Sequence, residues 1–162
     1  MKTMASLLVV FFIFVISSPA QAVEPGAEMF AAATGGKLAQ VKQLVLDGAP
    51  VDSANAQGRT PVMGAAFYGN LRVVQFLLAE GADITVVDNQ KMTVLMLAAQ
   101  SGNPDLIQLL VANGADIKAK NKSGQTAIAV AKMFGHSAVV AVLEQLSDLG
   151  SETAGDKNSK KK

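Results

Sequence analysis

The sequence contains no cysteine and a single histidine, His136. A chain without cysteine forms no disulfide and carries no lipid-modified cysteine, so an exported form must rely on its core for stability. Metal centres built from histidine and cysteine are excluded within one chain, because such centres need several of these ligands. His136 occupies a position that Asn70 and Asn103 hold elsewhere in the chain, which favours a structural role.

Sequence motifs of common enzymes are also missing. There is no G-x-S-x-G element for a nucleophilic serine. The pair Gly35-Gly36 lacks the Gly-Lys-Ser/Thr ending of a phosphate-binding loop, and residues 88–90 lack calcium-loop spacing. Two carboxylates can act as acid and base, but Asp83 and Asp116 recur because a turn recurs. We therefore predict a protein that is not an enzyme and that uses no cofactor or metal.

Neither sign of charge dominates the sequence. Beyond Lys2 there are 13 basic and 13 acidic residues, which is not the pattern of a nucleic-acid-binding protein. The segment 150–162 contains four lysines and two acidic residues among glycine, serine and asparagine. Its composition predicts a disordered, solvated tail in place of an arm that binds nucleic acid or lipid.

Residues 1–22 have the features of a signal peptide. Lys2 precedes an apolar run over 7–16, and Ala20-Gln21-Ala22 forms an A-x-A cleavage site. The run has ten residues, whereas a membrane-spanning helix needs about 20. An uncleaved anchor or a buried strand is the alternative. We expect cleavage after Ala22 and a periplasmic or secreted bacterial protein, with no membrane attachment afterwards.

A segment of the chain recurs every 33 residues. Threonine and glycine recur in phase as Thr60, Thr93 and Thr126, then Gly69, Gly102 and Gly135. The Gly-Ala-Asp of 81–83 returns at 114–116. A fixed period in this range is typical of a stacked repeat array, in which neighbouring units share one continuous core.

Each unit predicts two short helices followed by a tight hairpin. The threonine is placed to cap the first helix, and the glycine to end it. Asn70 and Asn103 stand where they would cap the second helix. That helix carries apolar residues at helical spacing and stops at Gly81 or Gly114.

This pattern resembles the ankyrin repeat, which reads roughly D-x-x-G-x-T-P-L-H-x-A-A and ends in G-A-D. The resemblance covers about residues 26–147 and implies an all-α solenoid of about four stacked repeats within a domain spanning 23–149. The repeats are expected at 26–52, 53–85, 86–118 and 119–148, the first being an atypical N-terminal cap.

Two departures from the ankyrin pattern affect the expected structure. The family's histidine is replaced by Met63, Met96 and Ala129, which removes the usual polar link between repeats. The hairpin glycine, present as Gly58 and Gly124, is replaced by Lys91 in the third repeat. A non-glycine residue is disfavoured in a left-handed turn, so this hairpin is predicted to be the softest.

In ankyrin arrays, partners usually bind a concave face made by the hairpin tips and the exposed side of the first helices. Carried over by position, the resemblance implies that another protein binds these residues: Arg59, Phe67, Tyr68, Gln90, Met92, Gln100, Ser101, Lys122, Met133 and Phe134. Tyr68 and Arg59 are the strongest candidates, because tyrosine and arginine are enriched at binding hot spots. The alternative for the three aromatic residues is burial under the hairpins as part of the core.

The resemblance implies a monomer that acts by protein–protein interaction without catalysis. One interpretation is a binding module of the bacterial periplasm. A second is an accessory protein that supports a periplasmic catalase or peroxidase, since some small exported bacterial ankyrin proteins look like helpers of such enzymes. A third is an inhibitor or immunity protein that blocks a toxin or hydrolase. The three interpretations differ in the partner.

Overall fold

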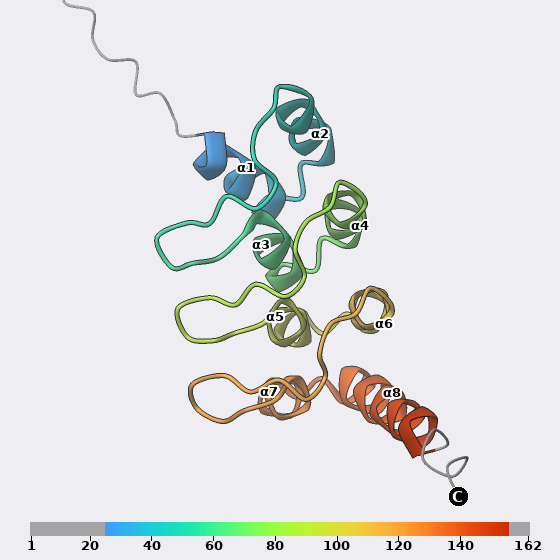
Figure 1. Ribbon diagram of the computed structural model, residues 1–162. Helices are drawn as coiled ribbons and strands as arrows, with labels where there is room; N and C mark the ends of the chain where they lie inside the picture. The colour runs from blue at the N-terminus through green and yellow to red at the C-terminus, as the bar shows by residue number, and fades with distance from the viewer. Residues whose placement is uncertain (1–24, 156–162) are drawn as a thin grey trace, which may run out of the picture.

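The structure is a computed structural model that describes residues 25–155 of the 162-residue chain. These residues form helices in four consecutive pairs (Figure 1). The helices are α1 (Pro25–Thr34), α2 (Leu38–Leu46), α3 (Pro61–Phe67), α4 (Leu71–Ala79), α5 (Val94–Ser101), α6 (Pro104–Ala112), α7 (Ala127–Met133) and α8 (Ser137–Gly155). The all-α solenoid predicted from the sequence is confirmed. The proposed signal peptide lies outside the described residues.

The helices form two parallel layers (Figure 1). The first helix of each pair contacts the first helix of the next pair, from α1 through α3 and α5 to α7. The second helices make the other layer in the same order, α2, α4, α6 and α8. The first helices, α1, α3, α5 and α7, are called the inner helices. Three hairpins project from their layer, on the side away from the second helices (Figure 1). This arrangement leaves one long face between the hairpins and the inner helices.

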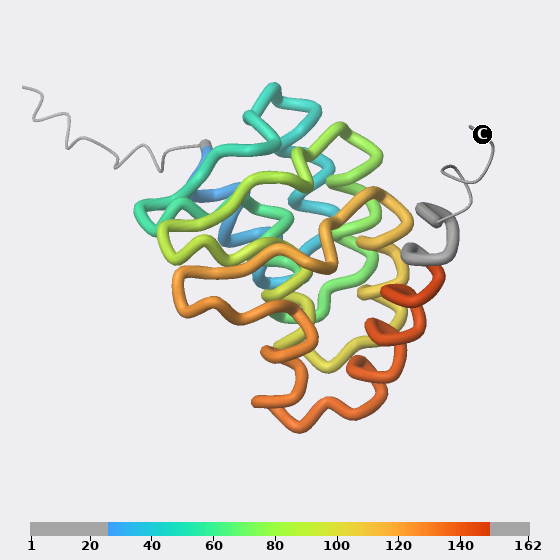
Figure 2. Tube along the Cα trace, turned by 60° about the horizontal axis from the view of Figure 1, so that its bottom comes forward, coloured from blue at the N-terminus to red at the C-terminus, as the bar shows by residue number. Residues whose placement is uncertain are grey.

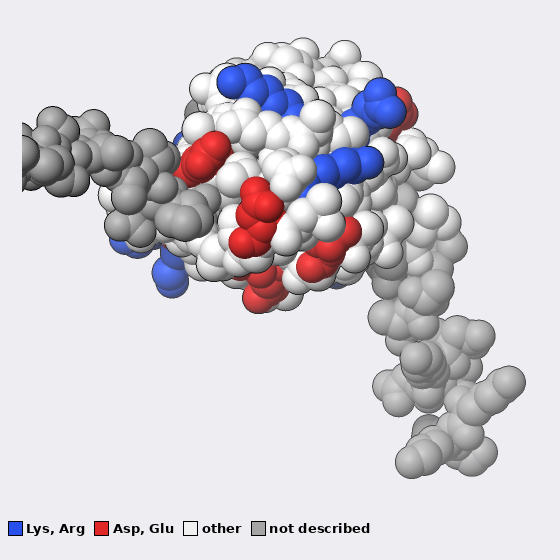
Figure 3. All heavy atoms as spheres, turned by 90° about the horizontal axis from the view of Figure 1, so that it is seen from above, with Lys and Arg blue, Asp and Glu red and all other residues white. Residues whose placement is uncertain are grey.

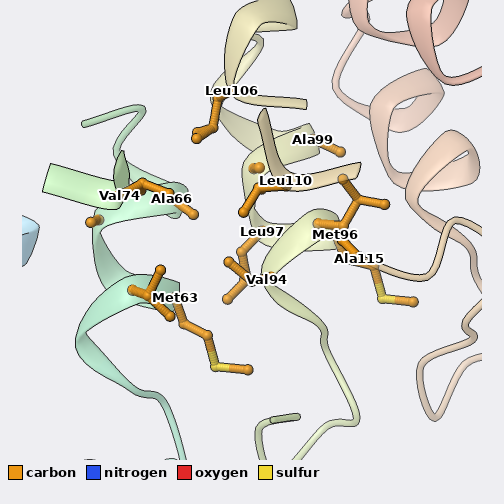
Figure 4. Packing of buried hydrophobic residues seen from close by; sticks show 14 of the residues in the cluster. Met63, Ala66, Val74, Val94, Met96, Leu97, Ala99, Leu106, Leu110 and Ala115 are labelled. Carbon is orange, nitrogen blue, oxygen red and sulfur yellow. The ribbon is translucent and has the colours of Figure 1, made fainter. Parts of the chain in front are cut away.

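The core runs through the stack without interruption. Helix α5 lies between α3 and α7, and its residues from Val94 to Ala99 are buried. Leu106 and Leu110 of α6 are also fully buried (Figure 4). Burying large apolar side chains of this kind contributes about 1.5–3 kcal/mol each, which explains why stacked units are stable where one unit is not.

The threonine caps are only partly as predicted. The Thr93 hydroxyl accepts a hydrogen bond from Met96 N at 3.2 Å, and the Thr126 hydroxyl accepts one from Ala129 N at 3.4 Å. Thr60 lies at the same position and has the same extended backbone, but its side chain makes no cap. Its hydroxyl is buried without a hydrogen-bond partner.

The residues expected to cap the second helices fall into two groups. Asn103 is a cap, because its Oδ1 accepts hydrogen bonds from Asp105 N and Leu106 N. The cap predicted for Asn70 is wrong. Its Nδ2 donates instead to the carbonyl oxygens of Ala33 and Thr34, at the end of α1 in the preceding repeat. A polar link between repeats therefore exists at Asn70, and not at the position where Met63 and Met96 replace the histidine of the ankyrin pattern.

The last helix is longer than expected from the sequence. The fourth repeat was expected at 119–148, whereas α8 continues to Gly155 and so enters the segment, 150–162, that was predicted to be a tail. Residues 156–162, with the terminal lysines, lie outside the described part of the chain. Over residues 25–155, no helix is both long enough and apolar enough to cross a bilayer.

Candidate protein-binding face

In each of the three hairpins, one side chain holds the turn by accepting hydrogen bonds from the backbone. Asn55, Asp88 and Asn121 follow one another at the repeat spacing. The Oδ1 atom of each accepts two backbone N–H groups of its own hairpin, at 2.8–3.0 Å. These are local turns in which a short polar side chain replaces a backbone acceptor. Only the middle hairpin uses a charged residue for this purpose.

Backbone hydrogen bonds join each hairpin to the next. Asn89 N donates to Gln57 O at 3.0 Å, and Lys122 N donates to Gln90 O at 3.0 Å. The hairpins lie one beneath another, as Figure 2 shows. They form a continuous shelf beside the inner helices. The surface made by the hairpins and the exposed side of the inner helices, called the hairpin face, is therefore ordered before any partner binds. A preformed surface loses little entropy on binding.

Lys91 has the unusual backbone geometry that the sequence predicted. Its φ is 57°, in the left-handed region, and it is the only non-glycine residue of the described chain with a positive φ. Gly58 and Gly124 occupy the same position of the neighbouring hairpins with φ of 75° and 74°. Because only glycine adopts this region without steric cost, Lys91 strains the middle hairpin.

Arg59 is held by an ion pair between two hairpins. Its Nε donates to Asp88 Oδ2 at 3.0 Å, and the side chains of Arg59 and Asp88 are 34% and 2% exposed. Asp88 thereby uses one oxygen for its own turn and the other for Arg59. The ion pair gives Arg59 a structural role besides its predicted place on the binding face, because its loss would leave a buried carboxylate unpaired.

A hollow of about 340 Å³ opens beside Arg59, between the first two repeats. The side chains that line it come from α1, α3 and the first hairpin: Phe30, Thr34, Asn55, Gln57, Arg59, Phe67 and Tyr68. The Arg59 guanidinium lies 6.0 Å from the centre of the Phe67 ring, a distance at which a cation is attracted to a ring face. Tyr68 meets Phe67 edge-on at 5.0 Å between ring centres.

Gly64 lines this hollow, and a residue with a side chain would not fit at this position. A Cβ atom at Gly64 would lie 2.6 Å from Thr34 Cγ2 and 2.9 Å from Phe30 Cε2. The glycine, in the interior of α3, therefore lets α1 approach closely enough to place the Phe30 ring beside Phe67. Phe30 was not among the residues predicted for the site. The repeat spacing places it level with Met63 and Met96, and this was the available signal.

The remaining predicted residues are spread along the face. Met92 corrects the prediction, since it is 8% exposed and lies under its hairpin, where Asn121 Nδ2 contacts its sulfur at 3.3 Å. Gln90 and Lys122 are exposed on the hairpins, and Gln100 and Ser101 are half-buried at the end of α5. Met133 and Phe134 are exposed beside the last hairpin. The hollow thus brings together Arg59, Phe67 and Tyr68, and not the other seven.

The sequence left two alternatives for the aromatic residues, exposure on the binding face or burial under the hairpins. Tyr68 is 64% exposed and Phe134 is 53% exposed, so neither is a core residue. Phe67 is half-buried and packs against the core while one part of its ring faces the hollow. The Phe134 ring stacks on the His136 imidazole at 6.3 Å between ring centres. Burial under the hairpins therefore describes Phe67 only in part.

The residues of the hollow do not form a centre for metal chemistry. Among the side chains that the structure describes, no three of His, Asp or Glu are placed together to hold a metal ion. Arg59, the charged residue of the hollow, has its partner in Asp88. What the hollow offers is apolar ring surface, the Tyr68 hydroxyl, the side-chain amides of Asn55 and Gln57, and the remaining guanidinium N–H groups.

Paired helices stacked in two layers, with hairpins that form a shelf along one side, define a repeat solenoid, a class of fold that presents extended surfaces to partners. Residues 29–121 and 95–159 match a family model described as ankyrin repeats (3 copies). These matches span most of the chain, and the protein belongs to the ankyrin-repeat family. Ankyrin repeats generally mediate binding to other proteins and are typically non-catalytic. No curated protein gives a significant match to the chain.

Proposed function

We propose that this protein is a non-catalytic binding module that captures another protein on its hairpin face, centred on the hollow at Arg59, Phe67 and Tyr68. The observation that carries the proposal is the ordered hollow itself. Two aromatic rings and a guanidinium meet there, all fixed by packing or by an ion pair. Binding energy at protein interfaces concentrates in residues of these types when they are held in place.

Photo-crosslinking from single positions tests this proposal. A photoreactive phenylalanine analogue is introduced at Tyr68 and, as a control, at Gln75. Gln75 is exposed on α4, in the layer away from the hairpins. We expect a specific adduct from position 68 in cells that express the protein, and none from position 75. Adducts from position 75 alone would place the binding face on the second helices and overturn the proposal.

The module is proposed to act as a monomer in the bacterial periplasm, or outside the cell, after cleavage following Ala22. The support is the apolar run of 7–16 and its A-x-A ending. Intact mass of the protein from the periplasmic fraction should correspond to a chain that starts at Val23. A membrane-bound species that retains residues 1–22 would contradict the assignment.

The adduct at position 68 also distinguishes the two finer interpretations. A catalase or peroxidase in the adduct would identify an accessory protein, and a hydrolase or toxin would identify an inhibitor. An activity assay of that partner with and without the module then shows whether binding supports or blocks it.

A further inference from the structure

The hairpins and the loops that leave the second helices carry charge of opposite sign. The three hairpin segments are residues 53–60, 86–93 and 119–126, and their charged residues are Arg59, Asp88, Lys91, Lys120 and Lys122. Asp88 is buried and paired with Arg59, whereas the three lysines are exposed. The hairpin edge is therefore positive, with three lysines that make no ion pair with a described residue.

The opposite sign collects on the loops that leave the second helices. These loops are residues 47–52, 80–85 and 113–118, and their charged residues are Asp47, Asp52, Glu80, Asp83, Asp116 and Lys118. The carboxylates in this set are exposed. Seen down the stack from the N-terminal end, acidic side chains gather at the centre and along one edge, and basic side chains lie to either side (Figure 3). An anionic partner is attracted to the hairpins and repelled by the loops.

We propose that the hairpin face binds an extended acidic segment of a partner protein, with one apolar side chain in the Arg59 hollow and carboxylates over Lys91 and Lys122. The proposal rests on the hairpin face being the binding face, as argued above. The hollow lies in the first two repeats, and Lys91 and Lys122 follow on the second and third hairpins. One line along the shelf thus passes an apolar site and then two cations.

The spacing of the repeats sets the spacing of the segment. Packed helices lie about 8–10 Å apart, and a segment in the extended polyproline II conformation advances about 3.1 Å per residue with three residues per turn. About three residues of the partner therefore cover one repeat. The segment that fits has one apolar residue and acidic residues about three and six positions away from it, on the same side.

The same features favour a protein segment over a nucleic acid. Arg59 is the residue best suited to bind a phosphate, but its Nε already donates a hydrogen bond to Asp88. The cations beyond it are a few lysines at hairpin tips, and the acidic loops repel a long polyanion. The Asn55 Nδ2 donor and the Gln57 amide beside the hollow suit the hydrogen-bonding groups of a peptide backbone.

Labelled twelve-residue peptides provide the test, with the full-length purified protein. The first peptide carries one phenylalanine and two glutamates, three and six positions away from it. It is made in two versions, with the glutamates on the N-terminal or on the C-terminal side of the phenylalanine. Lysine replaces both glutamates in the second peptide, and the third has both glutamates adjacent to the phenylalanine. A single-stranded DNA twelve-mer is the fourth probe. We expect the spaced glutamate peptide to bind, and to bind about tenfold or more tightly than each of the other three.

Charge-reversal variants locate the contact. Lys91→Glu/Lys122→Glu should weaken the spaced glutamate peptide about tenfold, and added salt should remove most of the difference. The matched control is Lys37→Glu/Arg72→Glu, which makes the same change in net charge at exposed positions off the hairpins. It should leave binding nearly unchanged. Melting curves of both double variants confirm that each is folded.

The outcomes separate the two proposals. Equal binding of the glutamate and lysine peptides, tighter binding of the DNA, or equal weakening by both double variants would overturn the acidic-segment proposal. If a natural partner still crosslinks to position 68 in that case, the hairpin face stands as the binding face and only the charge preference fails. If crosslinks form at position 75 alone, the proposed function fails as well.

Discussion

His136 Nε2 lies 2.9 Å from the carbonyl oxygen of Gln100, in the last turn of the first helix of the preceding repeat. Because a carbonyl oxygen only accepts, Nε2 carries the proton in this contact. Asn70 makes the corresponding bonds to Ala33 and Thr34 between the first two repeats. Both links join residues 36 positions apart. The side chain at this position thus ties one repeat to the end of the helix before it.

Removing this link should loosen the last repeat. His136→Ala should cost about 0.5–1.5 kcal/mol in the free energy of unfolding, the usual net contribution of one hydrogen bond. Denaturant unfolding measures the loss. His136→Asn, which places the residue of position 70 in the same role, should recover most of it. A His136→Asn variant no better than His136→Ala would show that ring stacking on Phe134, and not the hydrogen bond, stabilises this site.

Leucines at the centre and at the end of the stack should behave differently. Leu110 and Leu143 are both fully buried, and truncating either to alanine should cost about 2–5 kcal/mol locally. Leu110→Ala affects an interface with a repeat on each side, so it should uncouple both halves. Leu143→Ala should loosen mainly the last repeat. Hydrogen exchange resolves the two patterns, and identical loosening by both variants would argue against nearest-neighbour coupling.

Tyr68 and Arg59 should separate binding from stability. Tyr68→Ala removes an exposed ring and should weaken the partner by about 2 kcal/mol, near thirtyfold, with little change in melting. Arg59→Ala should also weaken the partner, but it leaves Asp88 as an unpaired buried charge and should destabilise the fold by about 3–5 kcal/mol. Titration and melting curves of both variants check this, and an unchanged melt for Arg59→Ala would contradict it.

A second change should rescue the Arg59 variant. Asn55 and Asn121 show that asparagine builds this hairpin without a charge. Asp88→Asn should therefore keep the two backbone hydrogen bonds and remove the unpaired carboxylate. The double variant Arg59→Ala/Asp88→Asn should melt well above Arg59→Ala alone. Failure of this rescue would mean that the guanidinium stabilises the fold through Phe67 rather than through Asp88.

Lys91→Gly should stabilise the protein by about 1 kcal/mol, because it removes a side chain from a left-handed turn that Gly58 and Gly124 adopt without strain. Thermal unfolding provides the measurement. Lys91→Ala is the control, since alanine keeps the Cβ atom and should give no such gain. Equal stabilisation by both substitutions would indicate charge repulsion and not backbone strain at this hairpin.

Asp83 provides a local test of pH dependence. Hydrogen bonds from the Thr85 hydroxyl and from Thr85 N hold the pKa of Asp83 below its ordinary value of 3.8. A carboxyl with a lowered pKa adds stability above that ordinary value and loses it as pH falls through the lowered one. In an NMR titration, Thr85→Ala should raise the pKa of Asp83 toward 3.8. An unchanged pKa would exclude the hydroxyl as the main cause.

The sequence predicted the helices well because their signals are local and repeat in phase. Threonine before each first helix, glycine after it and leucine at helical spacing mark each unit several times over. The partners of Asn70 and Arg59 were not predictable in this way. Each depends on which rotamer a polar side chain adopts toward a neighbouring repeat, and the hydrogen bonds of a helix cap and of a cross-repeat link use the same asparagine atoms.

The candidate site was predictable only in part, for a related reason. The repeat register correctly placed Tyr68 on the exposed side, as it did Phe134 at the same position of the last repeat. It could not show that Met92 turns under its hairpin while Arg59, at the same register position, reaches Asp88. Nor could it show the Phe30 ring, which reaches the hollow because Gly64 has no side chain to exclude it.

The hairpin shelf has a mechanical consequence for the whole stack. At Met63 and Met96 the contact between inner helices is apolar and has little directional preference, whereas backbone hydrogen bonds join the hairpins. Together with the links of Asn70 and His136, these hydrogen bonds are directional contacts between repeats, and those of the hairpins run along one edge. Curvature of the face should follow the lengths of two bonds, Asn89 N to Gln57 O and Lys122 N to Gln90 O. A ligand laid across both bonds would stiffen the stack along its length.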